Sequence, residues 1–244
     1  MEDPMQSKIA NPPFATQIMA IAAHPDDIES WCAGTLVAAI DNGASVRLLL
    51  VTSGEHGSSN RQDEPQQVAL RREQEARTAA KVLGIEEVQF LNCTDGEVEN
   101  TRTLRGDLVR WIRRWRPNVL FTHDPEHPIP PYLCHPDHRV VGRAALDATY
   151  PLARDHLAFA EQVRDEGLEP HSVEQVWLFA SGNTDVSYVD ITTSFERKLQ
   201  ARLAHASQTN DPQALREGWR TRAAAIGKPA GLPLAEAFTI LRLD

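Results

Sequence analysis

The chain contains two short clusters of imidazole and carboxylate side chains. The first is HPDD, in which His24, Asp26 and Asp27 directly follow an apolar run. Adjacent carboxylates repel each other, and removing them from water costs free energy unless a cation lies beside them. The stretch therefore predicts either a pair that faces water and caps a helix, or a pair that faces a cation.

The second cluster, HPDH, repeats the spacing of the first. His135 and His138 are three residues apart, as are His24 and Asp27, and this spacing lets two side chains at a helix start turn to one side. Two imidazoles and one carboxylate, with water in the fourth position, form a recurrent catalytic zinc site. The spacing leaves open whether His135 or His138 is the second imidazole.

The neighbouring carboxylates then have different roles. Asp27 binds the metal, and Asp26 stands beside the water in the open position. A metal acidifies that water toward a pKa of about 7, so a nearby carboxylate can take its proton. The alternative is structural, because Asp is strongly preferred as a helix N-cap and Asp26, Asp27 or Asp137 suits that position. Two such clusters, both at predicted strand ends, favour the metal site.

Apolar runs that alternate with amphipathic stretches predict the elements that position these clusters. Strands are expected at 17–23, 45–54, 86–92 and 118–125, each followed by a helix. This alternation indicates an α/β fold, a Rossmann-like parallel sheet with helices on both faces. Ligands bind such sheets at the carboxyl ends of the strands, where the strand order reverses. A 3-2-1-4 order of these four strands would bring both clusters to one site.

The last third of the chain predicts further strands at 174–180 and 186–191 and helices at 193–207 and 210–227. The single helix expected after the first strand covers 27–43. No linker composition marks a second domain, so residues 17–244 are expected to form one domain behind a flexible N-terminal tail, 1–16.

Composition narrows the partners and the compartment. The 244 residues carry a net charge of −9, which argues against a nucleic-acid partner and against an anionic membrane surface. The apolar run IMAIAA is too short for membrane insertion, and the acidic, Pro-rich start does not predict a signal peptide. Cys32, Cys93 and Cys134 form no CxxC pair, which favours a reducing, cytoplasmic location.

With these motifs in place, the chain resembles the PIG-L/LmbE-like zinc-dependent de-N-acetylases. The resemblance rests on AAHPDDIE, VTSGEHG, RPNVLFTHDPEHP, HPDH and VDITTSFERKLQARLAHASQ, and it extends from about residue 17 to the C-terminus. It implies a hydrolase that removes an N-acetyl group from a small amino-sugar substrate or conjugate. An amidase of thiol-cofactor conjugates is the alternative within the family, and relatives commonly form homo-oligomers.

The resemblance also implies roles for individual residues. It makes His24, Asp27 and His138 the ligands of Zn²⁺, or of another divalent first-row ion, and it makes Asp26 the general base. No organic cofactor is implied.

Around these, the resemblance implies that His135 stabilises the oxyanion and that Asp137 tunes it by favouring the imidazolium. Arg72 and Asp95 match positions that contact sugar hydroxyls in relatives. Tyr132 lies one position away from a tyrosine that some relatives use near the oxyanion.

Two other classes of function compete with amide hydrolysis. A phosphoesterase would need two metals about 3.5–4 Å apart and therefore more ligands. A metal- or sugar-binding module would keep the ligands but would have no use for Asp26. The pocket is expected to be shaped by segments 126–134 and 151–172, and His123, at the end of the fourth strand, is a candidate for its wall.

Overall fold

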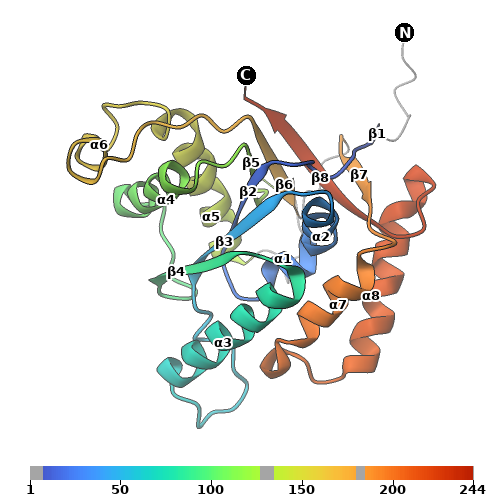
Figure 1. The fold of residues 1–244 in the computed structure, drawn as a ribbon. Helices are drawn as coiled ribbons and strands as arrows, with labels where there is room; N and C mark the ends of the chain where they lie inside the picture. Colours follow the sequence, from blue (N-terminus) through green and yellow to red (C-terminus); the bar gives the residue numbers. More distant parts are fainter. Residues whose placement is uncertain (1–7, 127–134, 180–184, 244) are drawn as a thin grey trace.

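An eight-stranded mixed sheet with helices on both sides forms the protein (Figure 1). The computed structural model describes residues 8–126, 135–179 and 185–243. The strands are β1 (Lys8–Ile9), β2 (Gln17–Ala22), β3 (Ser45–Thr52), β4 (Glu87–Cys93), β5 (Val119–His123), β6 (Gln175–Phe179), β7 (Ser187–Asp190) and β8 (Ala235–Arg242). The α-helices are α1 (Asp27–Trp31), α2 (Ala33–Asp41), α3 (Pro65–Leu83), α4 (Arg102–Trp115), α5 (Pro136–Asp147), α6 (Ala160–Glu166), α7 (Phe195–Leu203) and α8 (Pro212–Gly227).

The strand order confirms the predicted point of reversal. The sheet runs β1-β7-β8-β6-β5-β2-β3-β4, and the stretch from β4 to β6 is parallel throughout. β2 therefore lies between β3 and β5, the arrangement expected from the sequence, and the loops that follow β2 and β5 emerge at the same edge. The sheet is not wholly parallel, because β8 runs antiparallel to both β6 and β7.

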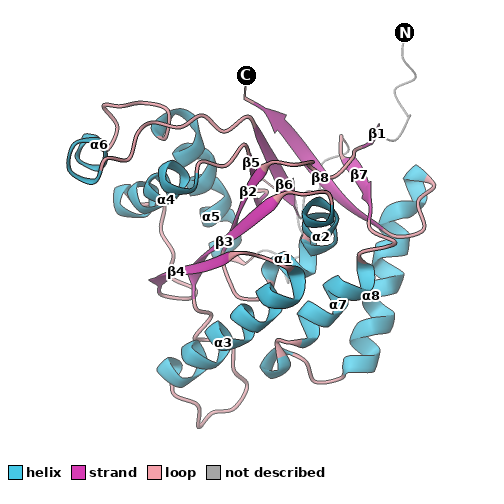
Figure 2. Ribbon diagram, viewed as in Figure 1, coloured by secondary structure: helices cyan, strands magenta, loops and turns pink. Residues whose placement is uncertain are grey.

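Burial on both faces explains why β2 is apolar at successive positions. Ile18 and Ala20 belong to one core cluster, with residues of α2, α3 and α7. Met19 and Ile21 belong to the opposite cluster, with residues of α4 and α5. Figure 2 shows these two groups of helices on either side of the strands. A strand covered on both sides needs no alternation of apolar and polar residues.

Two predicted boundaries differ in the structure. The single helix expected over 27–43 is divided into α1 and α2 at Cys32, whose φ of −137° is not helical. The second helix starts there because the Glu236 carboxylate accepts from Gly34 N and Thr35 N at 2.9 and 2.8 Å. Bonds of this kind satisfy N–H groups that a helix start leaves unpaired.

The N-terminal segment also differs from the expected tail over 1–16. Lys8 and Ile9 pair with β7, and Ala10 N donates to Tyr188 O at 2.8 Å. The reason is that β7 offers an unpaired backbone edge to an extended segment. None of the helices in the described part of the chain is long and apolar enough to cross a membrane.

Candidate metal centre

Three predicted ligand atoms converge beyond the ends of β2 and β5. His138 Nε2 lies 3.2 Å from His24 Nδ1 and 3.1 Å from Asp27 Oδ1, and His24 Nδ1 lies 3.6 Å from Asp27 Oδ2. Two imidazole nitrogens that face each other so closely need a proton or a cation between them. Tetrahedral zinc, with bonds of about 2.0–2.1 Å, separates its ligand atoms by about 3.3 Å. The donor set and its spacing therefore fit a divalent ion.

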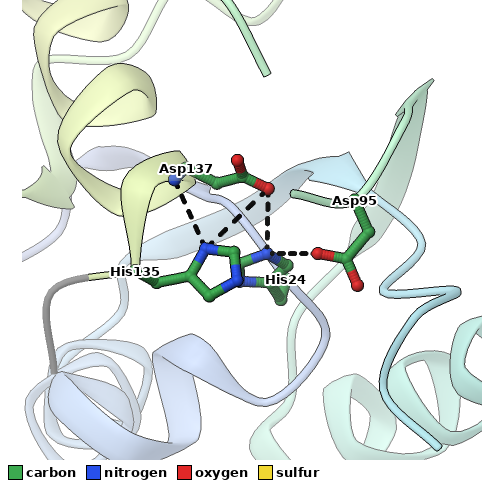
Figure 3. A group of neighbouring side chains, drawn as sticks. All are labelled: His24, Asp95, His135 and Asp137. Carbon is green, nitrogen blue, oxygen red and sulfur yellow. Dashed lines mark hydrogen bonds and ion pairs between the residues drawn. The ribbon is translucent and has the colours of Figure 1, made fainter. Parts of the chain in front are cut away.

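The second nitrogen of His24 is held from behind by two carboxylates. Its Nε2 lies 3.0 Å from Asp95 Oδ1 and 3.2 Å from Asp137 Oδ2 (Figure 3). Burial alone would lower the pKa of His24, but the bonds to Asp137, Asp27 and Asp95 outweigh it and raise that pKa to about 11. Carboxylates on the far side of an imidazole fix its orientation and leave the other nitrogen for a metal.

Asp26 occupies the N-cap position of α1 without acting as a cap. Its φ is 94°, and its side chain accepts no capping hydrogen bond. Its Oδ1 lies 3.5 Å from Arg72 Nη2, and its Oδ2 lies 3.6 Å from Arg202 Nη2. Burial raises the pKa of Asp26 and the charge of Asp27 adds to this, whereas Arg72 and Arg202 oppose it. The helix-cap interpretation of this carboxylate is therefore wrong.

His135, and not Asp137, is the N-cap of α5. Its Nδ1 accepts from Asp137 N at 3.3 Å, as Figure 3 shows. The neutral ring then carries its proton on Nε2, at the opposite side of the imidazole. Burial and the charge of His24 lower the pKa of His135, and Asp137 opposes them without prevailing. The expected effect of Asp137 has the right sign, but the net shift of the pKa is downward.

One cavity of about 480 Å³ brings the remaining predicted residues together. Its wall includes Arg72 and Asp95 beside the three ligands, Asp26 and His135. Arg72 is 5% exposed and donates to Pro25 O at 2.7 Å and to Gly54 O at 2.8 Å. It thus joins the HPDD loop to the loop after β3, in addition to its predicted contact with a sugar. Asp137 is fully buried and lies outside this wall.

Several sequence expectations about the pocket do not match its described wall. Residues 151–172 do not border it, because Arg113 holds part of this segment against α4 by donating to the carbonyl oxygens of Leu152, Ala153, Asp155, Ala158 and Phe159. Tyr132 and residues 127–134 lie outside the described part of the chain.

His123 lies behind the ligands and not in the pocket wall. It is 1% exposed, its Nε2 lies 3.2 Å from Asp27 Oδ2, and its ring stacks on His138 with centroids 4.1 Å apart. Burial lowers the pKa of His123 to about 4. A neutral ring in this position supports two of the predicted ligands at once.

Arg202 is a site residue that the sequence reasoning missed. It lies on α7, which packs against α3 and α1. In the sequence, α7 is far from both the HPDD and the HPDH motif. A signal was present, since Phe195, Leu199 and Arg202 have the spacing of one helix face and all three are buried. A buried cation on an otherwise apolar stripe indicates an acidic partner nearby, and here the half-buried Asp26 lies 3.6 Å from Arg202.

Comparison with known proteins places the chain in a family. Residues 19–149 match the family model described as PIG-L: GlcNAc-PI de-N-acetylase. The chain belongs to the PIG-L family. The match begins within β2, contains both motifs and ends just after α5.

Relatives with known names agree with this PIG-L assignment. The diacetylchitobiose deacetylase of Thermococcus kodakarensis is 32% identical, over 93% of this chain and 85% of that protein. The 1D-myo-inositol 2-acetamido-2-deoxy-alpha-D-glucopyranoside deacetylase of Nakamurella multipartita is 27% identical, over 92% and 89%. The structure of N,N'-diacetylchitobiose deacetylase from Pyrococcus horikoshii superposes with a TM-score of 0.85 at 30% identity, covering 93% of this chain and 84% of that one.

Proposed function

We propose that the protein is a zinc-dependent hydrolase that removes an N-acetyl group from an amino sugar or an amino-sugar conjugate. The observation that carries the proposal is the convergence of His24, Asp27 and His138 beside Asp26, a carboxylate that caps no helix. The family match and the deacetylase relatives support it. A His₂Asp set suits zinc, and it also suits iron and other first-row ions.

The chain's own residues account for the steps of amide hydrolysis. A divalent ion held by His24, Asp27 and His138 would polarise the acetyl carbonyl and acidify the attacking water. Asp26 takes the proton of that water and later gives it to the departing amine. The raised pKa of Asp26 suits a group that must both accept and return a proton.

His135 donates from Nε2 to the oxygen on which negative charge develops. Its N-cap bond from Asp137 N holds the ring in one orientation, so the donor is in place before the reaction starts. Donors of this kind contribute about 10²–10³ in rate. Arg72 and Asp95 line the same cavity and are proposed to bind sugar hydroxyls.

The arrangement of the ligands argues against a two-metal phosphoesterase. The other group that could hold an ion among the described residues, His24 with Asp95, His135 and Asp137, also uses His24. A second ion would therefore share this one imidazole with the first. One metal per chain is expected.

Free amine release tests the proposal. The protein is incubated with N-acetylglucosamine, with N,N'-diacetylchitobiose and with an N-acetylglucosaminyl inositol, each with zinc and with chelator. Zinc-dependent release from at least one of them is expected, and Asp26→Asn is the inactive control. Absence of release from all three, with one zinc ion bound per chain, would refute the proposed activity.

Location and assembly are proposals of the same kind. Among the cysteines that the structure describes, Cys32 and Cys93 are both free thiols, which supports a reducing, cytoplasmic location. A homo-oligomer is proposed from the family resemblance, and analytical ultracentrifugation measures the oligomeric state.

A further inference from the structure

The carboxylate of Asp26 lies between two guanidinium groups. Its Oδ1 is 3.5 Å from Arg72 Nη2, and its Oδ2 is 3.6 Å from Arg202 Nη2. No other hydrogen bond or ion pair links this side chain to the residues that the structure describes. A short charge-assisted hydrogen bond would measure about 2.7–2.9 Å. Each oxygen therefore faces one cation, and neither contact is close enough to hold the carboxylate alone.

Arg202 is held in place by hydrogen bonds of its own. Its Nη1 donates to Thr209 Oγ1 at 2.8 Å, and its Nη2 donates to Gln208 O at 3.0 Å. Gln208 ends the short 3₁₀-helix η3 (Ala206–Gln208), and Thr209 follows it. The position of this guanidinium is therefore fixed by the turn after α7 and does not depend on Asp26.

The charge of Arg202 has one counter-charge in the described part of the chain. The residue is buried, and its one ion pair there is with Asp26. A buried cation costs free energy unless an anion lies beside it. Arg72 differs, because it also donates to Pro25 O and Gly54 O and borders the metal pocket. Arg202 does not border that pocket, so its contact with Asp26 is separate from substrate binding.

Orientation matters for a general base. The base must lie about 2.6–3.2 Å from the atom whose proton it takes, and the terminal torsion of an Asp side chain is broad. A cation at one oxygen leaves the carboxylate free to turn about that contact, whereas a second cation at the other oxygen fixes the plane of the group. Capping gives Asp26 no further anchor, because its side chain accepts no capping bond.

We propose that Arg202 is a positioning residue for Asp26. With Arg72 at Oδ1 and Arg202 at Oδ2, the carboxylate keeps one orientation toward the attacking water. Arg202 does not touch the substrate, and it acts on the reaction through Asp26. The inference rests on the proposed function, in which Asp26 is the general base, and it adds a residue that the reaction requires.

Removal of the cation tests the positioning role. Arg202→Met keeps a long apolar stem in the core and removes the charge. We expect kcat to fall at least about tenfold, because a displacement of about 1 Å at a reacting centre can cost about 100-fold. KM and zinc content should stay near their wild-type values, since Arg202 contacts neither the pocket nor the metal ligands. Arg202→Lys should recover part of the loss, because it keeps the charge without the fork.

A double-mutant cycle separates positioning from a structural role. Loss of Arg202 also loosens η3, whose Gln208 borders the metal pocket, and such a defect would lower activity in any background. Asp26→Asn removes the base and keeps its shape, and Asn tolerates the φ of 94° at this position. If Arg202 acts through Asp26, Arg202→Met should change the residual kcat of Asp26→Asn less than about twofold. An equal fold-loss in both backgrounds would overturn the proposal, as would an unchanged kcat in Arg202→Met.

The matched control is Arg197→Met on the same helix. Arg197 donates to Val37 O at 3.4 Å and to Asp41 Oδ1 at 2.7 Å, and it does not border the metal pocket. Its loss also removes a guanidinium from α7, but kcat should stay within about twofold of wild type. If Arg202→Met does not fold, Arg202→Lys takes its place in the cycle.

Crystal structures separate failure of this inference from failure of the proposed function. If no substrate releases amine, or if Asp26→Asn keeps the wild-type kcat, the proposed function or its general base fails. Structures of the zinc-bound wild type and of zinc-bound Arg202→Met then decide the positioning role. One orientation of the Asp26 carboxylate in the wild type, and another or several in the variant, supports it. The same single orientation in both proteins refutes it.

Discussion

A single methyl group at Gly142 should damage the site from outside the pocket. Gly142 lies on α5, the helix that carries His138, and faces the end of β5. A Cβ at this position would lie 2.4 Å from the carbonyl oxygen of His123 and 3.2 Å from Pro125 N. Both neighbours are backbone atoms, so no side-chain rotation relieves the clash. Gly142→Ala therefore forces α5 and β5 apart.

The size of this displacement follows from the contact distance. Ordinary contact of a methyl group begins at 3.4 Å, against 2.4 Å here, so α5 must retreat by about 1 Å unless the end of β5 moves with it. Metal–ligand distances tolerate about 0.2 Å, and a displacement of about 1 Å at a reacting centre can cost about 100-fold in rate. We expect kcat/KM to fall about 100-fold, with weaker metal binding, because His138 moves away from His24 and Asp27.

Gly218→Ala on α8 is the matched control. An added methyl there meets nothing within 4 Å, and alanine in place of glycine stabilises a helix by up to about 1 kcal/mol. The assay measures amine release at saturating zinc together with a chelator-competition titration of metal affinity. If Gly142→Ala keeps kcat/KM within threefold of wild type and binds zinc as tightly, the packing of α5 on β5 does not set the ligand geometry.

Three further predictions concern the site itself. Asp26→Asn should keep its metal and lose at least about 100-fold in kcat, as removal of a general base does. Asp27→Asn should lose its metal. Equal metal content in the two variants would contradict the separate roles of Asp26 and Asp27. His135→Ala should retain metal and lower kcat and kcat/KM together, about 10²–10³-fold; rescue by excess zinc would show that His135 is a ligand. Metal binding near pH 7 should release about one proton. Without metal the pKa of His24 is raised to about 11, and a histidine ligand must lose that proton to bind the metal. The affinity for the metal should therefore rise with pH up to the pKa of His24. Calorimetry in buffers of different ionisation enthalpy measures the release, and its absence would refute the protonated state of His24.

The core of the site was predictable because it follows from local pattern and strand order. β2 and β5 are short apolar runs, each followed by an HPD motif, and parallel neighbours place such motifs at one edge. The sequence therefore predicted that the HPDD and HPDH clusters meet. The choice of His138 as the ligand, with His135 beside the oxyanion, came from the family resemblance. The spacing of the residues alone allows either histidine to bind the metal.

What escaped prediction depends on contacts between distant segments. The break between α1 and α2 depends on Glu236, which lies 202 residues from Gly34. Arg202 reaches Asp26 from α7, and nothing in the short-range pattern around HPDD indicates that contact. β8 was not predicted at all, because its sequence, AEAFTILR, interrupts the apolar residues with Glu236, Thr239 and Arg242. Its antiparallel direction depends on pairing with β6 and β7 and not on its own residues.

The position of β8 has a consequence for how the protein is made. β8 contains residues 235–242 and is synthesised after β6 and β7, yet it lies between these two strands in the finished sheet. Until it arrives, β6 is an open edge, and β7 with β1 has no sheet to join. Open edges invite pairing with other chains, and long-range pairing of this kind is slow. The nascent protein therefore passes through a stage in which the five parallel strands from β4 to β6 are formed but β8 is not yet paired. A chain that ends before β8 would remain in that aggregation-prone stage.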